Sequence, residues 1–204
     1  MDKKFLSLFS FDITPYSKEV EYKKGESIFS LGDDENKLVY IYKGNSKCST
    51  IYPDGSTSLL DYAPSPSLYG ELELLEIQKY TSNVIAETNC YGYLIDLARC
   101  KEKILADPVF LKNLLNYIAT KLFRVNQRMA DNISLPLKKR LAEYIIKMAK
   151  DDIYSENHIT TSEYMACTYR HLLFTFSFFE ENGALKKIKR GRYKIVDKAK
   201  LLED

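Results

Sequence analysis

The spacing of hydrophobic residues divides the chain into stretches with different periods. Up to position 106, short runs of Val, Ile, Tyr, Thr and Leu alternate with turn residues roughly every 8–12 positions, which is typical of an antiparallel sandwich or barrel. The expected strands are Glu19–Tyr22, Ser27–Ser30, Leu38–Lys43, Lys47–Tyr52, Ser56–Tyr62, Ser82–Glu87 and Cys90–Ile95. Turn signals separate them at Lys24-Gly25, Leu31-Gly32-Asp33-Asp34, Lys43-Gly44-Asn45 and Pro53-Asp54-Gly55.

The period changes at Asp107-Pro108, where an N-cap residue precedes a proline at the first helical position. From there, apolar residues recur with spacings of 4, 3, 4, 3 and 4, at Leu111, Leu115, Ile118, Leu122, Val125 and Met129. This seam predicts a helix over 107–133. The helix either packs on its own β module or pairs in parallel with the same helix of a second chain. The strict 3.5-residue period favours the dimer, because an ordinary packed helix has a period of 3.6.

A third pattern follows the predicted helix. Ser134-Leu135-Pro136 interrupts the seam and predicts a hinge, after which a second amphipathic helix runs from Leu137 to near Lys150. The hydroxyl and carboxylate groups of Thr160-Thr161-Ser162-Glu163 fit a capping box, which predicts the start of a short helix that ends near Ala166.

The C-terminal pattern predicts a helix and a basic hairpin. A turn at Cys167-Thr168 leads into a helix over Tyr169–Glu181, and Asn182-Gly183 ends that helix. Two short strands, Ala184–Lys189 and Tyr193–Val196, then flank Arg190-Gly191-Arg192. Helix, tight turn, helix and basic hairpin together predict a winged helix-turn-helix.

The charges divide the chain in the same way. The 204 residues are 45% hydrophobic and 28% charged, which is ordinary globular composition. Residues 1–133 carry 16 basic and 18 acidic side chains, whereas residues 134–204 carry 14 basic and 10 acidic ones. The segment Lys186–Lys200 alone holds eight bases and one acid, Asp197. An acidic-to-neutral module is therefore followed by a basic one.

Several classes of protein are excluded by what the sequence lacks. No apolar run is long enough for a membrane helix, and Phe5–Phe9 is too short for a secretory signal, so we expect a cytoplasmic protein without membrane contact. The four cysteines are scattered and the two histidines lie far apart: Cys48, Cys90, Cys100, Cys167, His158 and His171. No zinc site, disulfide framework or catalytic constellation is expected, and hence no enzyme.

Short motifs along the whole chain carry a family resemblance. In order, they are Gly25-Glu26-Ser27-Ile28-Phe29, Gly32-Asp33, Leu38-Val39-Tyr40-Ile41-Tyr42-Lys43-Gly44, Pro53-Asp54-Gly55, Tyr69-Gly70-Glu71-Leu72-Glu73-Leu74-Leu75, Asp152-Ile153-Tyr154, Glu163-Tyr164-Met165 and Thr168-Tyr169-Arg170-His171-Leu172-Leu173. Together they resemble the Crp/Fnr family of bacterial transcription regulators, most closely its YeiL-type members.

The resemblance implies an α+β fold with three parts. These are a cyclic-nucleotide-binding-like β-roll over 1–106 that serves as an effector domain, a dimerisation helix over 107–133, and a winged-helix DNA-binding domain over 134–204. The implied partners are double-stranded DNA, a second copy of the chain and RNA polymerase.

The resemblance also assigns candidate DNA contacts. The second helix of the helix-turn-helix enters the major groove, and here it opens with Tyr169, Arg170 and His171 after Thr168. Arg170 is the best candidate for reading a base, because a guanidinium can bond O6 and N7 of guanine together. Tyr169 and His171 can donate to phosphate or stack on a thymine methyl, and Thr168 can bind a backbone phosphate. The cations of the wing meet phosphates, and they are Lys187, Lys189, Arg190 and Arg192. The alternative is that Arg170 and His171 form a solvated helix face.

Crp-type reading helices carry an arginine where this chain has Phe174, and a glutamate where it has Arg170. The usual half-site of the family is therefore not expected. The surrounding apolar run is mostly core, yet it is too apolar for every member to be buried: Leu172, Leu173, Phe174, Phe176, Phe178 and Phe179.

The effector site departs from the pattern of cyclic-nucleotide binders. Gly70, Glu71 and Leu72 match the turn and short helix whose amides hold the phosphate and whose Glu bonds the ribose. However, Tyr80-Thr81 stands where these binders have Arg-Ser or Arg-Thr, whose Arg neutralises the cyclic phosphate. Without that Arg the buried phosphate has lost its partner, which weakens binding by ~3–5 kcal/mol. Val125-Asn126 aligns with the adenine-contacting Thr-Ser pair of the cyclic AMP receptor. These departures predict an effector other than cyclic AMP, or no small effector; alternatively, Gly70 and Glu71 are inherited fold structure.

Other branches of the family require groups that are missing. The iron–sulfur branch uses an N-terminal cysteine cluster, but no cysteine precedes Cys48, and the haem branch needs a histidine in the β module, but none precedes His158. No metal, haem or iron–sulfur cluster is therefore expected, while a two-thiol redox switch stays open. The rival function is a small-molecule sensor that acts through protein contacts, with a vestigial winged helix. The basic wing and Arg170 argue against it.

Overall fold

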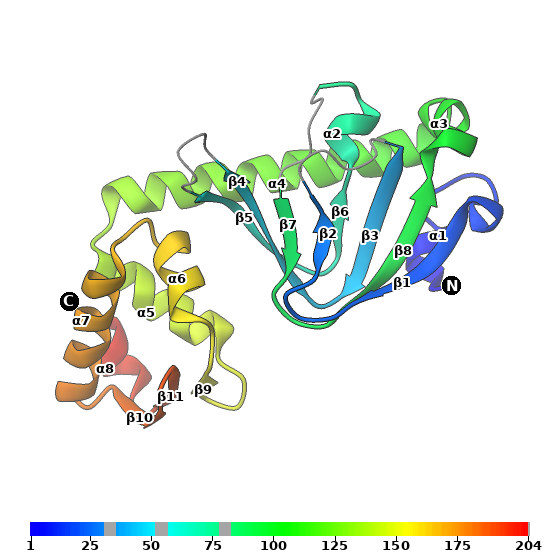
Figure 1. Ribbon diagram of the computed structural model, residues 1–204. Coiled ribbons are helices and arrows are strands. Elements are labelled where there is room, and N and C mark those ends of the chain that lie inside the picture. The colour runs from blue at the N-terminus through cyan, green and yellow to red at the C-terminus, as the bar shows by residue number, and fades with distance from the viewer. Residues whose placement is uncertain (31–35, 52–56, 78–82, 204) are drawn as a thin grey trace. The chain divides into compact units, whose positions relative to one another are not determined.

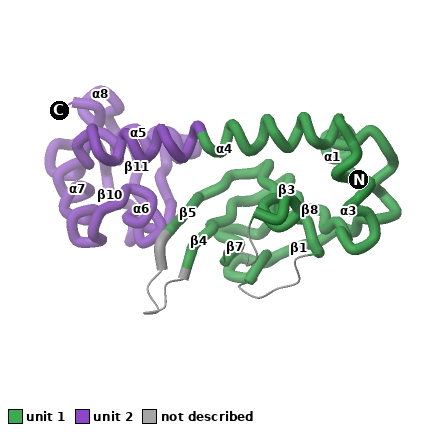
Figure 2. Tube along the Cα trace, turned by 90° about the horizontal axis from the view of Figure 1, so that it is seen from above, with its two compact units in different colours: residues 1–122 green, residues 123–204 purple. Residues whose placement is uncertain are grey.

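The computed structural model describes residues 1–30, 36–51, 57–77 and 83–203. Tertiary contacts divide the chain into two compact units, Met1–Leu122 and Phe123–Asp204, and the boundary falls inside the long helix α4 (Pro108–Ser134) (Figure 2). The predicted α+β class is confirmed. The division into 1–106, 107–133 and 134–204 stays a prediction, because α4 contributes to both units.

The first unit contains two four-stranded antiparallel sheets (Figure 1). One has the strand order β1-β8-β3-β6 and the other the order β2-β7-β4-β5. The strands are β1 (Ser17–Tyr22), β2 (Ser27–Phe29), β3 (Lys37–Lys43), β4 (Asn45–Ile51), β5 (Thr57–Pro64), β6 (Ser67–Tyr69), β7 (Asn83–Ala86) and β8 (Cys90–Asp96). All seven expected strands overlap one of these. The turns expected at Leu31–Asp34 and Pro53–Gly55 lie outside the described residues.

Strand β3 shows how the β-roll is packed on both faces. Val39 and Ile41 are buried in a cluster that draws on both sheets, while the alternate residues Leu38 and Tyr40 are buried among helices. Side chains alternate between the two faces of a strand, so a run that is apolar throughout fits a strand covered on both sides.

Helices cover the outer face of the first sheet. They are α1 (Lys3–Leu6), the 3₁₀ turn η1 (Thr14–Tyr16), α3 (Leu97–Leu105) and the N-terminal part of α4, with the single turn α2 (Glu71–Leu74) after β6. The buried Asp107 caps α4 as predicted, because its carboxylate accepts hydrogen bonds from the amides of Val109 (2.9 Å) and Ser10 (2.8 Å). Burial alone would raise the pKa of Asp107, but these hydrogen bonds lower it below its usual value.

The second unit is a winged helix. It contains α5 (Leu137–Met148), β9 (Ile153–Tyr154), α6 (His158–Tyr164), α7 (Tyr169–Glu181), β10 (Leu185–Lys189), β11 (Arg192–Ile195) and α8 (Lys198–Leu202). The sheet order is β10-β11-β9. Its core joins the helices to the wing, since the Phe176 and Tyr193 rings stack 4.6 Å apart.

The structure corrects one helix start. The capping box expected at Thr160–Glu163 is wrong, because α6 already begins at His158 and its N-cap is Asn157, whose side chain accepts from the amides of Ile159 and Thr160. The Thr161 hydroxyl donates back to the Asn157 carbonyl inside the helix. Among the described residues, no helix combines the length and hydrophobicity needed to cross a membrane.

Candidate nucleic-acid interface and effector site

The predicted reading helix is α7, and its start is defined by local chemistry. Ala166, with φ of +49°, reverses the chain after α6, and Thr168 is the N-cap of α7. The Thr168 hydroxyl accepts a hydrogen bond of 3.2 Å from the His171 amide. This bond satisfies one of the orphan amides of the first turn and leaves Tyr169, Arg170 and His171 at the exposed start of the helix.

The two faces of α7 differ sharply in burial. Leu172, Phe176 and Phe179 are fully buried and attach the helix to the core. The opposite face is exposed and includes Arg170 and, one turn later, Phe174, whose exposed fraction is 72%. Phe174 was not among the predicted DNA contacts. The excess of apolar residues in the run was the signal that could have identified it.

The wing presents its cations on the hairpin of β10 and β11. Lys187, Lys189 and Arg190 are exposed, and Gly191 at the tip has a φ of +72°. Arg192 is only half-buried, but its Nε atom is buried and finds no hydrogen-bond partner among the described residues. Because α7 packs against β10, one small unit carries both the reading helix and the basic hairpin.

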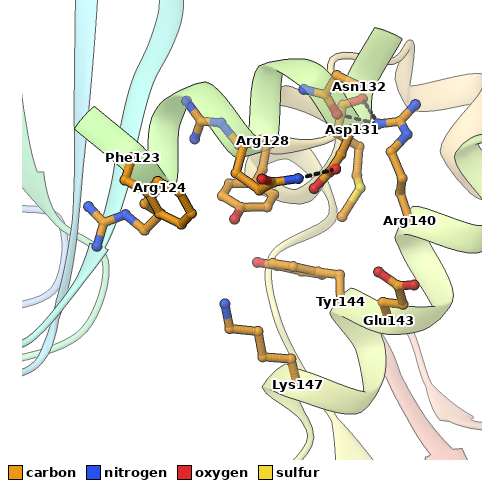
Figure 3. A pocket seen from close by; sticks show the side chains of 12 residues that line it. Phe123, Arg124, Arg128, Asp131, Asn132, Arg140, Glu143, Tyr144 and Lys147 are labelled. Carbon is orange, nitrogen blue, oxygen red and sulfur yellow. Dashed lines mark hydrogen bonds between the residues drawn. The ribbon is translucent and has the colours of Figure 1, made fainter. Parts of the chain in front are cut away.

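Arg140 holds the helix-turn-helix to the end of α4. Its guanidinium donates to the carbonyls of Leu135 (3.0 Å) and Met165 (2.7 Å) and to the side chain of Asn132. These groups belong to the segment after α4, the C-cap of α6 and α4 itself. Arg140 also lines a hollow of about 320 Å³ between α4, α5 and α6, and the Tyr144 ring and the Lys147 ammonium point into this hollow (Figure 3). Sequence reasoning missed Arg140.

The candidate effector site contains an ion pair that sequence reasoning also missed. Gly70, with φ of +92°, precedes α2, and a Cβ there would lie 2.3 Å from the Lys37 carbonyl oxygen, so only glycine fits. Glu71 follows it and is buried. The Lys121 ammonium on α4 donates to the Glu71 carboxylate over 2.8 Å. The residue that would bind a ribose hydroxyl is therefore bonded to a lysine of the same unit.

Burial and charge act in opposite directions on Lys121. Burial alone would lower the pKa of its ammonium, but the Glu71 carboxylate and, from β5, the Asp61 carboxylate raise it above the usual lysine value. Asp61 is itself buried. Among the residues that the structure describes, the carboxylates of Glu71 and Asp61 therefore both act on the Lys121 ammonium.

The other predicted effector residues are placed as follows. Leu72 is half-buried in α2, and its carbonyl accepts from the Ile77 amide. Tyr80 and Thr81 lie outside the described residues. Val125 is half-buried and Asn126 exposed, both on α4 within the second unit.

The predicted dimer seam is largely exposed in the single chain. Leu115, Leu122 and Met129 expose 68%, 58% and 56% of their surface, and Leu111 is also exposed. Ile118 and Val125 are half-buried. A different stripe of α4 meets the β-roll, because Phe110 and Leu114 are buried in its core and the Tyr117 hydroxyl donates to the Leu68 carbonyl.

The candidate redox groups are all free thiols. Burial raises the pKa of Cys90 and Cys167, and it raises the pKa of Cys100 to about 11. Within the part of the chain that the structure describes, no three His, Cys, Asp or Glu side chains gather in an arrangement that could hold a metal ion.

Comparisons with known proteins agree with this architecture. The family "Cyclic nucleotide-binding domain" matches residues 19–107. The regulatory protein YeiL of Escherichia coli O157:H7 is 28% identical over 187 residues, which is 92% of this chain and 85% of that protein. A CRP-like cAMP-activated global transcriptional regulator of Mycobacterium tuberculosis CDC 1551 / Oshkosh is 25% identical over 68% of this chain and 62% of its own length.

The fold has close counterparts among solved structures. A CRP-family transcriptional regulator from Thermus thermophilus superimposes with a TM-score of 0.75 at 19% identity, covering 89% of this chain and 94% of that one. The β-roll, the long helix and the winged helix occur here in the order that the sequence motifs predict. Residues 19–107 thus match the cyclic nucleotide-binding domain family, and over most of its length the chain is similar to Crp/Fnr transcription regulators.

Proposed function

We propose that the protein is a homodimeric, sequence-specific DNA-binding regulator whose effector is not cyclic AMP, or which needs no small effector. The observation that carries this proposal is the exposed face of α7, where Arg170 is accessible while the opposite face is buried. Exposed cations on the adjoining hairpin supply the charge that a phosphate backbone attracts. RNA polymerase is an expected further partner.

Two kinds of DNA contact are expected. Arg170 lies in the first turn of α7, where a long side chain reaches base edges in the major groove. Arg190 lies at the tip of the hairpin, where the backbone is the natural partner. Base contacts specify sequence, whereas phosphate contacts set affinity and its dependence on salt.

Substitution of these two arginines should therefore have different consequences. Arg170→Ala should weaken binding to the specific site by about 1–3 kcal/mol and relax preference at one base pair per half-site. Arg190→Ala should weaken specific and non-specific binding equally. It should also reduce, by about one, the steepness with which log K falls as log salt concentration rises. Titrations of labelled duplexes at several salt concentrations measure both effects.

Lys112→Ala is the matched control, because it removes one exposed positive charge from α4 in the first unit. It should leave sequence preference unchanged. If Arg170→Ala selects the wild-type sequence with wild-type affinity, α7 does not read bases in the way proposed.

Cyclic AMP should not bind with micromolar affinity. Glu71 is already bonded to Lys121, and Asp61 adds a second carboxylate to the neighbourhood. A cyclic phosphate there would compete with the Glu71 carboxylate for the Lys121 ammonium and would lie near the second carboxylate. Titration calorimetry of the full chain with cyclic AMP measures this directly, and a micromolar dissociation constant would contradict the proposal.

A further inference from the structure

We propose that Phe174 recognises the 5-methyl group of a thymine, so that each half-site contains a thymine read by apolar contact. This inference rests on the proposed DNA-binding function and adds a base identity to it.

Phe174 projects from the same face as Arg170, one helical turn further along α7. Residues four apart lie next to each other on a helix surface, so the phenyl ring and the guanidinium are presented together. The ring is 72% exposed, whereas Phe176 and Phe179 of the same helix are buried. The core is therefore supplied by other aromatic residues, and Phe174 is available for an external contact.

The surroundings of Phe174 are mostly apolar. The ring borders a hollow of about 520 Å³ between α7 and the start of α5. The hollow is lined by Pro136, Leu137, Lys138, His171, Phe174, Thr175 and Phe178. The Lys138 ammonium lies 4.4 Å from the centre of the Phe178 ring, so a cation stands at the border of an otherwise apolar surface.

Charge selects DNA as the occupant of this surface. Lys138 borders it, Arg170 is exposed one helical turn before Phe174, and the same unit carries the exposed cations Lys187, Lys189 and Arg190 on the wing. A polyanion with exposed apolar groups matches this combination. In the major groove of a duplex, the apolar group among the base edges is the thymine methyl.

The chemistry of the ring restricts what it can read. A phenyl group neither donates nor accepts conventional hydrogen bonds, so it cannot recognise the polar edge of guanine, adenine or cytosine. It gains free energy only by burying apolar surface, which the thymine methyl provides. We therefore expect an A·T pair, with the methyl toward Phe174, close to the base pair contacted by Arg170.

Replacing thymine by deoxyuridine tests this inference, because it removes the methyl and leaves the hydrogen-bonding edges unchanged. The full chain is titrated with a duplex selected from a random pool and then with duplexes in which each thymine in turn is deoxyuridine. One thymine per half-site should be sensitive, with a loss of about 4-fold in affinity per methyl. With Phe174→Ala, thymine and deoxyuridine duplexes should bind equally well.

Ile159→Ala is the matched control, since Ile159 is also an exposed apolar residue of this unit but lies on α6. It should preserve the preference for thymine over deoxyuridine. The inference is overturned if wild-type protein binds all substituted duplexes as tightly as the original, or if Phe174→Ala keeps the wild-type preference. The first of these outcomes needs no variant to fold. Failure to bind any duplex would instead overturn the DNA-binding function itself, and this inference with it.

Discussion

Replacement of both Leu115 and Leu122 by lysine should convert the protein into a monomer. The two leucines are among the most exposed apolar residues of α4, and they lie on the predicted seam with spacings of 3 and 4 through Ile118. In a parallel pair, each lysine would face the same residue of the second chain. Burying unpaired, like-charged ammonium groups should reduce the free energy of dimerisation by several kcal/mol at each of the two positions.

Loss of the dimer should also reduce DNA binding strongly. A dimer joins two reading helices, and linking two sites raises apparent affinity by a factor of about 10²–10⁴. We therefore expect the double variant to sediment as a single chain and to bind the selected duplex at least about 100-fold more weakly. Leu202→Lys, which adds a charge at another exposed leucine, on α8, is the control. A double variant that sediments as a full dimer would contradict the prediction that these residues form the dimer interface.

The second large effect is expected from the ion pair between Lys121 and Glu71. Lys121→Met removes the ammonium and leaves a buried carboxylate without its partner, which should lower the free energy of unfolding by about 3 kcal/mol. Glu71→Gln added to Lys121→Met removes the stranded charge and should restore most of that loss. Urea unfolding of the three proteins measures both changes.

The pH dependence of this pair has a defined sign. The folded pKa of Lys121 lies above its usual value, so its contribution is fully present below the usual lysine pKa and is lost as pH rises through the folded value. The difference in stability between wild type and Lys121→Met should therefore be constant near neutral pH and shrink at strongly alkaline pH. Equal stability of the two proteins at neutral pH would show that the pair does not stabilise the β-roll.

Elements whose signals are local were predictable from the sequence. The bounds expected for α7, Tyr169–Glu181, are those observed, because a hydroxyl N-cap and an Asn-Gly terminator lie at its two ends. Helix α4 likewise begins at Pro108, directly after the Asp107 cap. The capping box at Thr160–Glu163 failed because a stronger cap, Asn157, lies three residues upstream and starts the helix earlier.

Elements and contacts that depend on tertiary packing were not predictable in the same way. Strand β6 has only three residues, all buried, and pairs with β3 far away in the chain. Lys121 lies outside the dimer seam, on a second stripe of α4 that runs through Phe110, Leu114, Tyr117 and Lys121 with spacings of 4, 3 and 4. A lysine that ends an apolar stripe indicates a buried partner, but only the fold shows that this partner is Glu71.

Selection from a pool of random duplexes shows whether the protein reads DNA by sequence as a dimer. The full chain is used, with and without an extract of its host cells as a source of effector, and the number of chains on each selected duplex is determined by native mass spectrometry. We expect an inverted repeat, with half-sites about one helical turn apart and two chains bound. Absence of any enriched sequence under both conditions, or a single chain on an asymmetric site, would contradict the claim.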